Sequence, residues 1–265
     1  MKVTGLFVYP LKSARALSLQ EAHLDEFGIR GDRRWCLVDD DGRVITQRES
    51  PVLATLDVVP SADGLELRAA RRPALRVRTP GPDQPVCPAQ VRADHTEGRL
   101  AGAGADAWLS DLLGRSCHLL HMPPSTRRQV SLTHGRPGDR VSFADGYPLL
   151  LTNEASLAAL NERLPRAVPM DRFRPNLVID GVEPFAEDGW SRIRAGGTEF
   201  RVVKPCARCV VTTTDQQTGD REKEPLRTLA TFRNVGGKVL FGETLIHEGT
   251  GPIRLGDGVE VVEAR

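Results

Sequence analysis

The sequence lacks long hydrophobic runs, an N-terminal leader and an excess of charge of one sign. No apolar run approaches membrane-spanning length, and the N-terminus MKVTGLFVYPLKS has no basic start followed by an apolar core. Lys and Arg number 36 against 35 for Asp and Glu. This balance provides no whole-protein field to attract nucleic acid or anionic lipid. We therefore expect a soluble, cytoplasmic protein with a small-molecule partner, no nucleic acid and no membrane.

Cysteine is also scarce, and its pattern argues against a secreted disulfide framework. The five cysteines are Cys36, Cys87, Cys117, Cys206 and Cys209. Small secreted domains carry dense, even sets of cysteines, whereas this set is odd and scattered. Reduced thiols are therefore expected. At 265 residues the chain can bury a sizeable core, as one large domain or as two closely packed small ones.

Helical patterning is sparse, and most of the chain has the pattern of short strands. Asp41-Gly42 and Asp63-Gly64 each stand between two apolar runs, which predicts β-hairpins in the first third. The apolar spacing and end signals predict three short helices, over 106–113, 153–164 and 224–233. Segments such as 198–206 and 258–264 are predicted strands. The chain is thus expected to be mostly β, with a boundary between residues 115 and 130.

The strongest chemical signal is the segment KPCARCVVTTTDQQTG at 204–219, in which two cysteines stand three positions apart. Lys204 and Arg208 beside them favour the thiolate form. Four interpretations remain open: packed thiols without a role, a zinc site, a redox dithiol, or a soft thiolate ligand for a metal that an organic cofactor also holds. A dithiol would favour a strand-to-helix junction, whereas the β-branched run at 209–214 predicts more strand. Spacing alone does not choose among the four.

Five ordered motifs add a family resemblance that extends over essentially the whole chain. They are VYPLKS (8–13), GIRGDRRW (28–35), FADGYPLLLTNEASL (143–157), RFRPNLVI (172–179) and KPCARCVVTTTDQQTG (204–219). Together they resemble the MOSC family, in the branch with an N-terminal MOSC β-barrel domain that contains the mitochondrial amidoxime reducing component and bacterial relatives. The resemblance implies a mostly β (α+β) fold. A β-rich N-terminal domain, 1–120, packs on a MOSC β-barrel, 121–265, with a few short helices, and the cofactor lies between the two.

The resemblance also implies the cofactor, which is molybdenum bound to molybdopterin. Cys209 would complete the sulfur ligation of the metal, and Cys206 would lie beside the cofactor without being a ligand. A thiolate is a soft donor and suits this task. No iron–sulfur cluster or flavin is expected within the chain, so electrons are expected from a separate donor protein of the ferredoxin or cytochrome/flavoprotein type.

Further site residues follow from the same resemblance. The phosphate of the pterin would be bound by Lys12, Ser13, Arg33 and Arg174, because guanidinium and ammonium groups match phosphate oxygens. The remaining cofactor contacts would come from Gly146, Tyr147, Asn176, Ala207, Arg208 and Thr244. Asp145 would act as a catalytic proton donor or orienting group, with an ordinary turn aspartate as the alternative. No role is assigned to His118, His121 or His134.

The implied reaction is the two-electron reduction of the N–O bond of N-hydroxylated compounds at molybdenum. Two alternatives from other classes remain. One is a module that carries sulfur or molybdenum cofactor without turnover of its own, and the other is an interaction module with a vestigial site. Molybdenum content separates the enzyme from the carrier, because a transient carrier would hold less than one metal per chain.

Overall fold

Short strands dominate the computed structural model, which describes residues 1–265. The three helices are α1 (Ala103–Leu113), α2 (Glu154–Asn161) and α3 (Leu226–Phe232). The strands are β1 (Lys2–Val8), β2 (Leu17–Ser18), β3 (Glu21–Asp25), β4 (Gly28–Ile29), β5 (Trp35–Val38), β6 (Val44–Ile45), β7 (Asp57–Ser61), β8 (Gly64–Arg68), β9 (Leu75–Arg78), β10 (Val86–Val91), β11 (Asp94–Leu100), β12 (His118–His121), β13 (Leu149–Asn153), β14 (Leu177–Asp180), β15 (Trp190–Ala195), β16 (Thr198–Ala207), β17 (Asn234–Val235), β18 (Lys238–His247), β19 (Pro252–Arg254) and β20 (Val259–Ala264). The predicted mostly β fold with a few short helices is confirmed.

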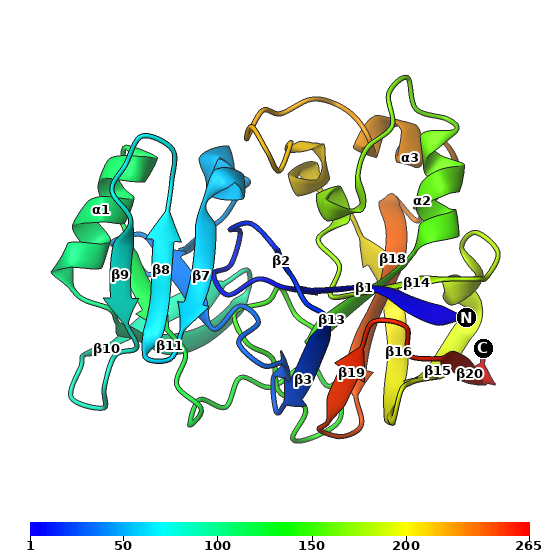
Figure 1. The fold of residues 1–265 in the computed structure, drawn as a ribbon, viewed down its shortest axis with the longest axis horizontal. Coiled ribbons are helices and arrows are strands. Elements are labelled where there is room, and N and C mark those ends of the chain that lie inside the picture. Colours follow the sequence, from blue (N-terminus) through cyan, green and yellow to red (C-terminus); the bar gives the residue numbers. More distant parts are fainter.

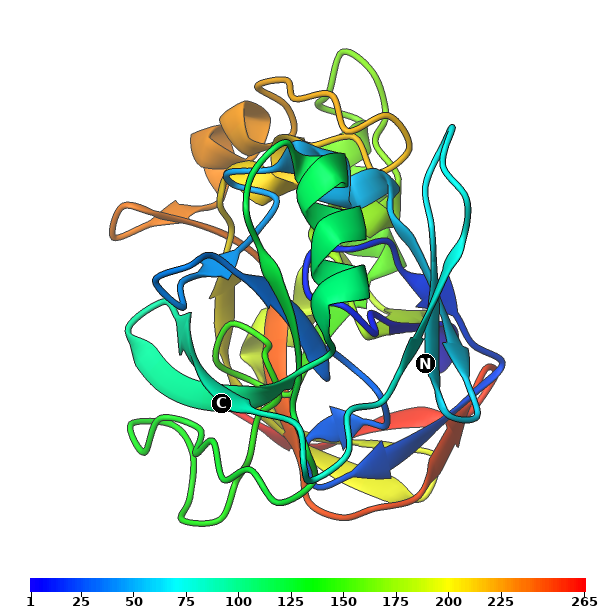
Figure 2. The same cartoon turned by 90° about the vertical axis from the view of Figure 1, so that its left-hand side faces the viewer.

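The chain forms two lobes that lie side by side (Figure 1). One holds the small antiparallel sheets β7-β8-β9 and β10-β11-β12-β5-β6, with α1 packed on them (Figure 2). The other is built on a sheet of nine strands, in the order β2-β1-β14-β13-β18-β16-β15-β20 with β17 beside β18. Buried apolar side chains form a separate core in each lobe.

The two lobes do not divide the chain cleanly in sequence. β1 pairs with β14, and β3 pairs with β19. The first part of the chain is therefore built into the large sheet before the chain crosses to the small lobe. The division into 1–120 and 121–265 remains a prediction about sequence segments, because the sheets themselves exchange strands across it.

All three predicted helices are present, with shifted ends. α2 begins after Asn153, whose side-chain oxygen accepts a hydrogen bond from the Ala155 amide at 3.0 Å. It ends at Asn161, whose side-chain amide donates to the carbonyl of Val168 and accepts from the amide of Val168. None of the helices combines the length and apolar character that crossing a bilayer requires.

One local prediction is wrong. The run after Cys209 was expected to continue as a strand, but Val210–Thr213 forms a 3-10 helix. The hydroxyl of Thr212 donates to the Cys209 carbonyl at 3.0 Å, and that of Thr213 donates to the Val210 carbonyl at 2.8 Å. These local side-chain bonds offer the backbone an alternative to a sheet ladder. A predicted strand after Cys209 therefore no longer counts against a redox dithiol. The roles of the two cysteines have to be inferred from their surroundings.

Candidate functional site

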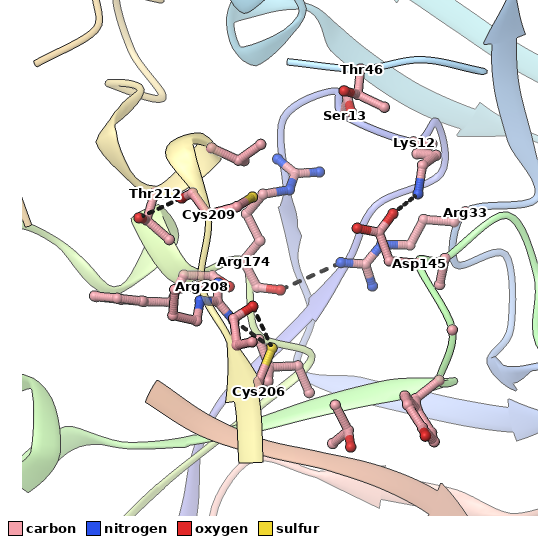
Figure 3. Close-up of a pocket in the computed structure, with 18 of the residues that line it drawn as sticks. Lys12, Ser13, Arg33, Thr46, Asp145, Arg174, Cys206, Arg208, Cys209 and Thr212 are labelled. Atoms are coloured by element: carbon pink, nitrogen blue, oxygen red, sulfur yellow. Dashed lines mark hydrogen bonds and ion pairs between the residues drawn. The ribbon is translucent and has the colours of Figure 1, made fainter. Parts of the chain in front are cut away.

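A cavity of about 300 Å³ opens between the two lobes, and all thirteen predicted site residues line it. They are Lys12, Ser13, Arg33, Asp145, Gly146, Tyr147, Arg174, Asn176, Cys206, Ala207, Arg208, Cys209 and Thr244. Figure 3 shows the two cysteines on one side and the Lys12–Asp145 pair on the other. Residues that are far apart in sequence thus meet in one place.

The closed end of the cavity is built around the buried ring of Tyr9. The guanidinium carbons of Arg33 and Arg174 each lie 4.2 Å from the centroid of this ring. The Tyr9 hydroxyl donates to the carbonyl of Pro175 at 3.0 Å, and burial raises its pKa to about 12. Burial also lowers the pKa of Arg174 to about 10, which still leaves it charged at neutral pH. Two cations are therefore held together by an aromatic ring before any ligand arrives.

Hydrogen bonds fix Arg33 further. Its Nη1 donates to Asp32 at 2.6 Å and to the side-chain oxygen of Asn176 at 2.9 Å. The Asn176 nitrogen in turn donates to Asp32 at 3.1 Å and to the Phe7 carbonyl at 3.2 Å. Asn176 thus positions Arg33 and links β1 to the start of β14, while its contact with a pterin remains a prediction.

The opposite end of the cavity holds Asp145 among three cations. One carboxylate oxygen binds the ammonium of the buried Lys12, and the other accepts from Arg48 at 3.1 Å and Arg92 at 3.0 Å. Desolvation acts to raise the pKa of Asp145, but Lys12, Arg92 and Arg48 outweigh it and hold the pKa well below its usual range. Burial lowers the pKa of Lys12 in spite of the partner carboxylate. Asp145 is a carboxylate at neutral pH.

The two cysteines have different surroundings. Cys206 lies near the end of β16, and its sulfur accepts from Nη1 of Arg208 at 3.0 Å. The sulfur of Cys209 accepts from Arg48 at 3.5 Å, so a residue of the other lobe reaches it. Both cysteines are free and partly exposed. Each thiol therefore has its own cation, and only Cys209 is in contact with the lobe that carries Arg48.

The remaining predicted residues form the walls of the cavity. Thr244 donates its hydroxyl to the Lys204 carbonyl at 3.0 Å, which ties β18 to β16. The Lys204 ammonium lies 4.9 Å from the centroid of the Tyr147 ring. These contacts fix the side chains of Thr244 and Lys204 in the wall of the cavity.

The backbone is strained at the cavity. Six non-glycine residues have positive φ, and four of them line it: Ser13 (71°), Arg33 (47°), Arg92 (56°) and Arg174 (55°). Such conformations cost about 1–3 kcal/mol each and concentrate at functional sites. The clustering singles out this cavity independently of any motif.

Ten further lining residues were not predicted, namely Thr46, Arg48, Arg92, Ala144, Leu149, Leu150, Phe173, Lys204, Val211 and Thr212. Arg48 and Arg92 matter most because both bind Asp145. The turn that carries Arg92 gave no signal, because its two central residues, Arg92 and Ala93, are not the glycine, asparagine or aspartate that usually mark such a turn. No local pattern marks Arg48.

The histidines lie outside this cavity. His118 binds Asp106 at 2.8 Å and Asp40 at 3.2 Å, and these hydrogen bonds raise its pKa. His121 packs on Trp35 with 4.6 Å between ring centroids, and burial lowers its pKa to about 4. His134 lies 6.3 Å from Tyr147, ring to ring.

The donor set fits the cofactor that the sequence suggested. Nowhere do three or more His, Cys, Asp or Glu side chains gather as a ready-made metal site. The cavity instead offers a soft sulfur donor at Cys209 and, apart from it, the paired guanidiniums of Arg33 and Arg174. A metal whose cofactor brings its own sulfur ligands and a phosphate matches this separation.

Comparison with known proteins gives the same picture. The MOSC N-terminal beta barrel domain matches residues 1–116, and the MOSC domain matches residues 138–260. Mitochondrial amidoxime-reducing component 1 of Mus musculus is 37% identical over 97% of this chain and 81% of its own length, and that of Homo sapiens is 34% identical over 97% and 82%. The molybdenum cofactor sulfurase of Danio rerio is 32% identical over 93% of this chain but only 32% of its own length.

These relatives contradict one expectation. A cytoplasmic location was predicted from the composition, whereas the matching amidoxime-reducing components are named as mitochondrial. The physical reason is that an address need not be part of the folded domains, so their composition carries no information about the compartment.

The motifs, the matched domains and relatives above 30% identity over most of their length agree. The chain therefore belongs to the MOSC family, in the branch that includes the mitochondrial amidoxime-reducing components.

Proposed function

We propose that the protein is a molybdenum-cofactor-dependent oxidoreductase that reduces N-hydroxylated compounds. The observation that carries this is one cavity with a soft thiol at one side, Cys209, and a paired-arginine anion site, Arg33 and Arg174, at its closed end. Relatives named amidoxime-reducing components match nearly the whole chain and support the reaction class. In the overall reaction an amidoxime takes up two electrons and two protons and yields the amidine and water.

The residues divide the work by chemistry. Arg33 and Arg174 would bind the phosphate of the cofactor, with Ser13 adding a hydroxyl. Lys12 was predicted to share this task, but its ammonium is paired with Asp145 at the opposite end of the cavity. Cys209 would be the protein ligand to molybdenum. When bound, the cofactor supplies the two-electron redox chemistry at the substrate oxygen. Both lobes contribute to this set, so neither would retain the cofactor well alone.

Asp145 is better suited to orient the substrate than to donate a proton. Its three cations keep it ionised at neutral pH, and an ionised carboxylate accepts hydrogen bonds only. The amino and hydroxyl groups of an amidoxime are donors. Asp145 would therefore fix the direction in which the N–O bond faces the metal, and the protons for water would come from another source.

A separate protein would supply the electrons, because no dinucleotide or flavin fingerprint occurs in the sequence. Protein with one molybdenum per chain should reduce benzamidoxime with dithionite-reduced methyl viologen and should be inactive with NADH alone. Full metal content without turnover under both conditions would overturn the proposal.

The second candidate is a carrier of sulfur or molybdenum cofactor. It is favoured by the match to a molybdenum cofactor sulfurase over 93% of this chain. A carrier should co-purify with well under one molybdenum per chain and should release it to an apoenzyme. Stable, stoichiometric metal together with turnover would exclude it.

A further inference from the structure

The cavity has more positive charge than the proposed cofactor needs. Seven cations and one acid line it, the cations being Lys12, Arg33, Arg48, Arg92, Arg174, Lys204 and Arg208. Under the proposed function, on which this inference rests, Arg33 and Arg174 face the cofactor phosphate. Lys12 already neutralises one oxygen of Asp145. Arg48 and Arg92 therefore form a surplus at the opposite end.

These two arginines lie at the solvent-exposed end of the cavity, which we call its mouth. Both donate to the same oxygen of Asp145, at 3.1 Å and 3.0 Å, and their side chains remain 28% and 55% exposed. Arg48 also lies 3.5 Å from the Cys209 sulfur. A guanidinium has five N–H donors, so one carboxylate oxygen and one thiol leave most of them free.

The backbone of Arg48 is fixed without the help of its guanidinium. Thr46 donates through its amide and its hydroxyl to Glu49, and the Arg48 amide donates to the Thr46 hydroxyl at 3.1 Å. The Arg48 carbonyl accepts from Arg221 of the other lobe at 3.2 Å. The turn holds the arginine over the cavity and leaves its charged end for another task.

Arg92 occupies a turn position at which arginine is unfavourable. It is the first of two residues that join β10 to β11, and Val91 pairs with Asp94 across the turn. Its φ is 56°, a conformation for which glycine, asparagine or aspartate is preferred. The side chain of Arg92 binds only Asp145, so no other contact with the fold offsets the backbone strain. The residue serves the cavity.

We propose that Arg48 and Arg92 form an anion subsite that binds a carboxylate or phosphate group on the N-hydroxylated substrate. The anion would share the free guanidinium donors while Asp145 keeps Lys12 as its partner. Substrates that carry such a group would be preferred over neutral ones. An acidic surface of an electron-donor protein is the competing occupant, and the experiment separates the two.

The test compares benzamidoxime with 4-carboxybenzamidoxime, using reduced methyl viologen so that no donor protein is present. We expect the wild type to prefer the carboxylated compound in kcat/KM per bound molybdenum. R48Q and R92G should each lower this preference by about threefold to tenfold, because each removes one charge-assisted contact. R92K should retain most of it. The control R78A removes a charge that is 91% exposed on β9 outside the cavity, and should leave the preference unchanged.

A binding measurement adds a readout without turnover. Calorimetry of the metal-loaded protein with 4-carboxybenzamidine and benzamidine should show the same loss of carboxylate preference in R48Q and R92G. The melting temperature of R92G should equal or exceed that of the wild type, because glycine adopts the positive φ of this turn without backbone strain. A drop in R92G stability with an unchanged preference would mean that Arg92 serves the fold, and would overturn the subsite.

The outcomes separate this inference from the function it rests on. If the wild type reduces neither compound, the proposed function fails. If the wild type reduces benzamidoxime but the preference for the carboxylated compound is the same in the wild type and all variants, the function stands and the anion subsite is overturned. A defect that appears only with a protein electron donor would assign the arginines to donor docking and would equally overturn the subsite.

Discussion

The two ends of the cavity are built in different ways. At the closed end, Arg33 and Arg174 flank a Tyr9 ring that is 1% exposed, and Asp32 and Asn176 bind Arg33. At the mouth, Asp145 is 42% exposed and shares its oxygens among Lys12, Arg48 and Arg92. The closed end has its partners in place, whereas the mouth keeps donors in contact with water.

This difference suits the closed end to retaining the cofactor and the mouth to selecting the substrate. Groups that are buried and already oriented lose little freedom when a ligand binds, which favours tight binding of one cofactor. Partly exposed guanidiniums on turns can exchange one acceptor for another at small cost. The mouth is therefore the place where different substrates can be accommodated.

The largest effect is expected at the sulfur that would bind the metal. Cys209→Ser should lower N-hydroxy reduction by more than about a hundredfold, because a hydroxyl is too hard and too weakly acidic to replace a thiolate. Cys206→Ser should retain activity within about tenfold, since Cys206 contacts only Arg208 and its own loop. Molybdenum content and turnover are measured together. Equal losses in the two variants would instead favour a dithiol.

The closed end should control how firmly the cofactor is held. Arg33→Ala and Arg174→Ala should each weaken retention by about tenfold to a hundredfold, because a charge-assisted bond contributes about 1.5–3 kcal/mol. The measurement is molybdenum per chain after dialysis, beside the unfolding of cofactor-free samples, which removes the stabilisation that a ligand adds. The exposed arginine Arg76 provides a control through Arg76→Ala. Full occupancy in both cavity variants would contradict the phosphate assignment.

The smallest effect is expected from the ion cluster at the mouth. Three cations hold the folded-state pKa of Asp145 below its ordinary value, so its contribution to stability is present above about pH 3.8 and is lost as the pH falls through the folded pKa. Asp145→Asn should therefore cost about 1 kcal/mol at pH 7, a value reduced by solvent screening. The difference should shrink toward zero in acid. Urea unfolding of cofactor-free protein measures it, from pH 7 to as far below pH 3.8 as the protein stays folded, and a gap that does not narrow below pH 3.8 would contradict the ionic origin.

Much of the site was predictable because its residues belong to contiguous motifs. Lys12 and Ser13, Asp145 to Tyr147, and Cys206 to Cys209 each lie within one short segment. Arg48 and Arg92 were missed for the opposite reason. They meet Asp145 across 97 and 53 residues of sequence, and no short pattern records such a meeting.

The sequence determined the fold class and the three helices, and the family resemblance gave the thirteen residues that line the cavity. Hairpin signals, helix caps and apolar spacing act over a few residues, so they can be recognised in the sequence. The tertiary structure alone decided that β1 joins β14, that Val210–Thr213 turns instead of extending, and that Asp145 stays ionised. Each of these depends on which distant groups come within hydrogen-bonding range, and local propensity does not encode that.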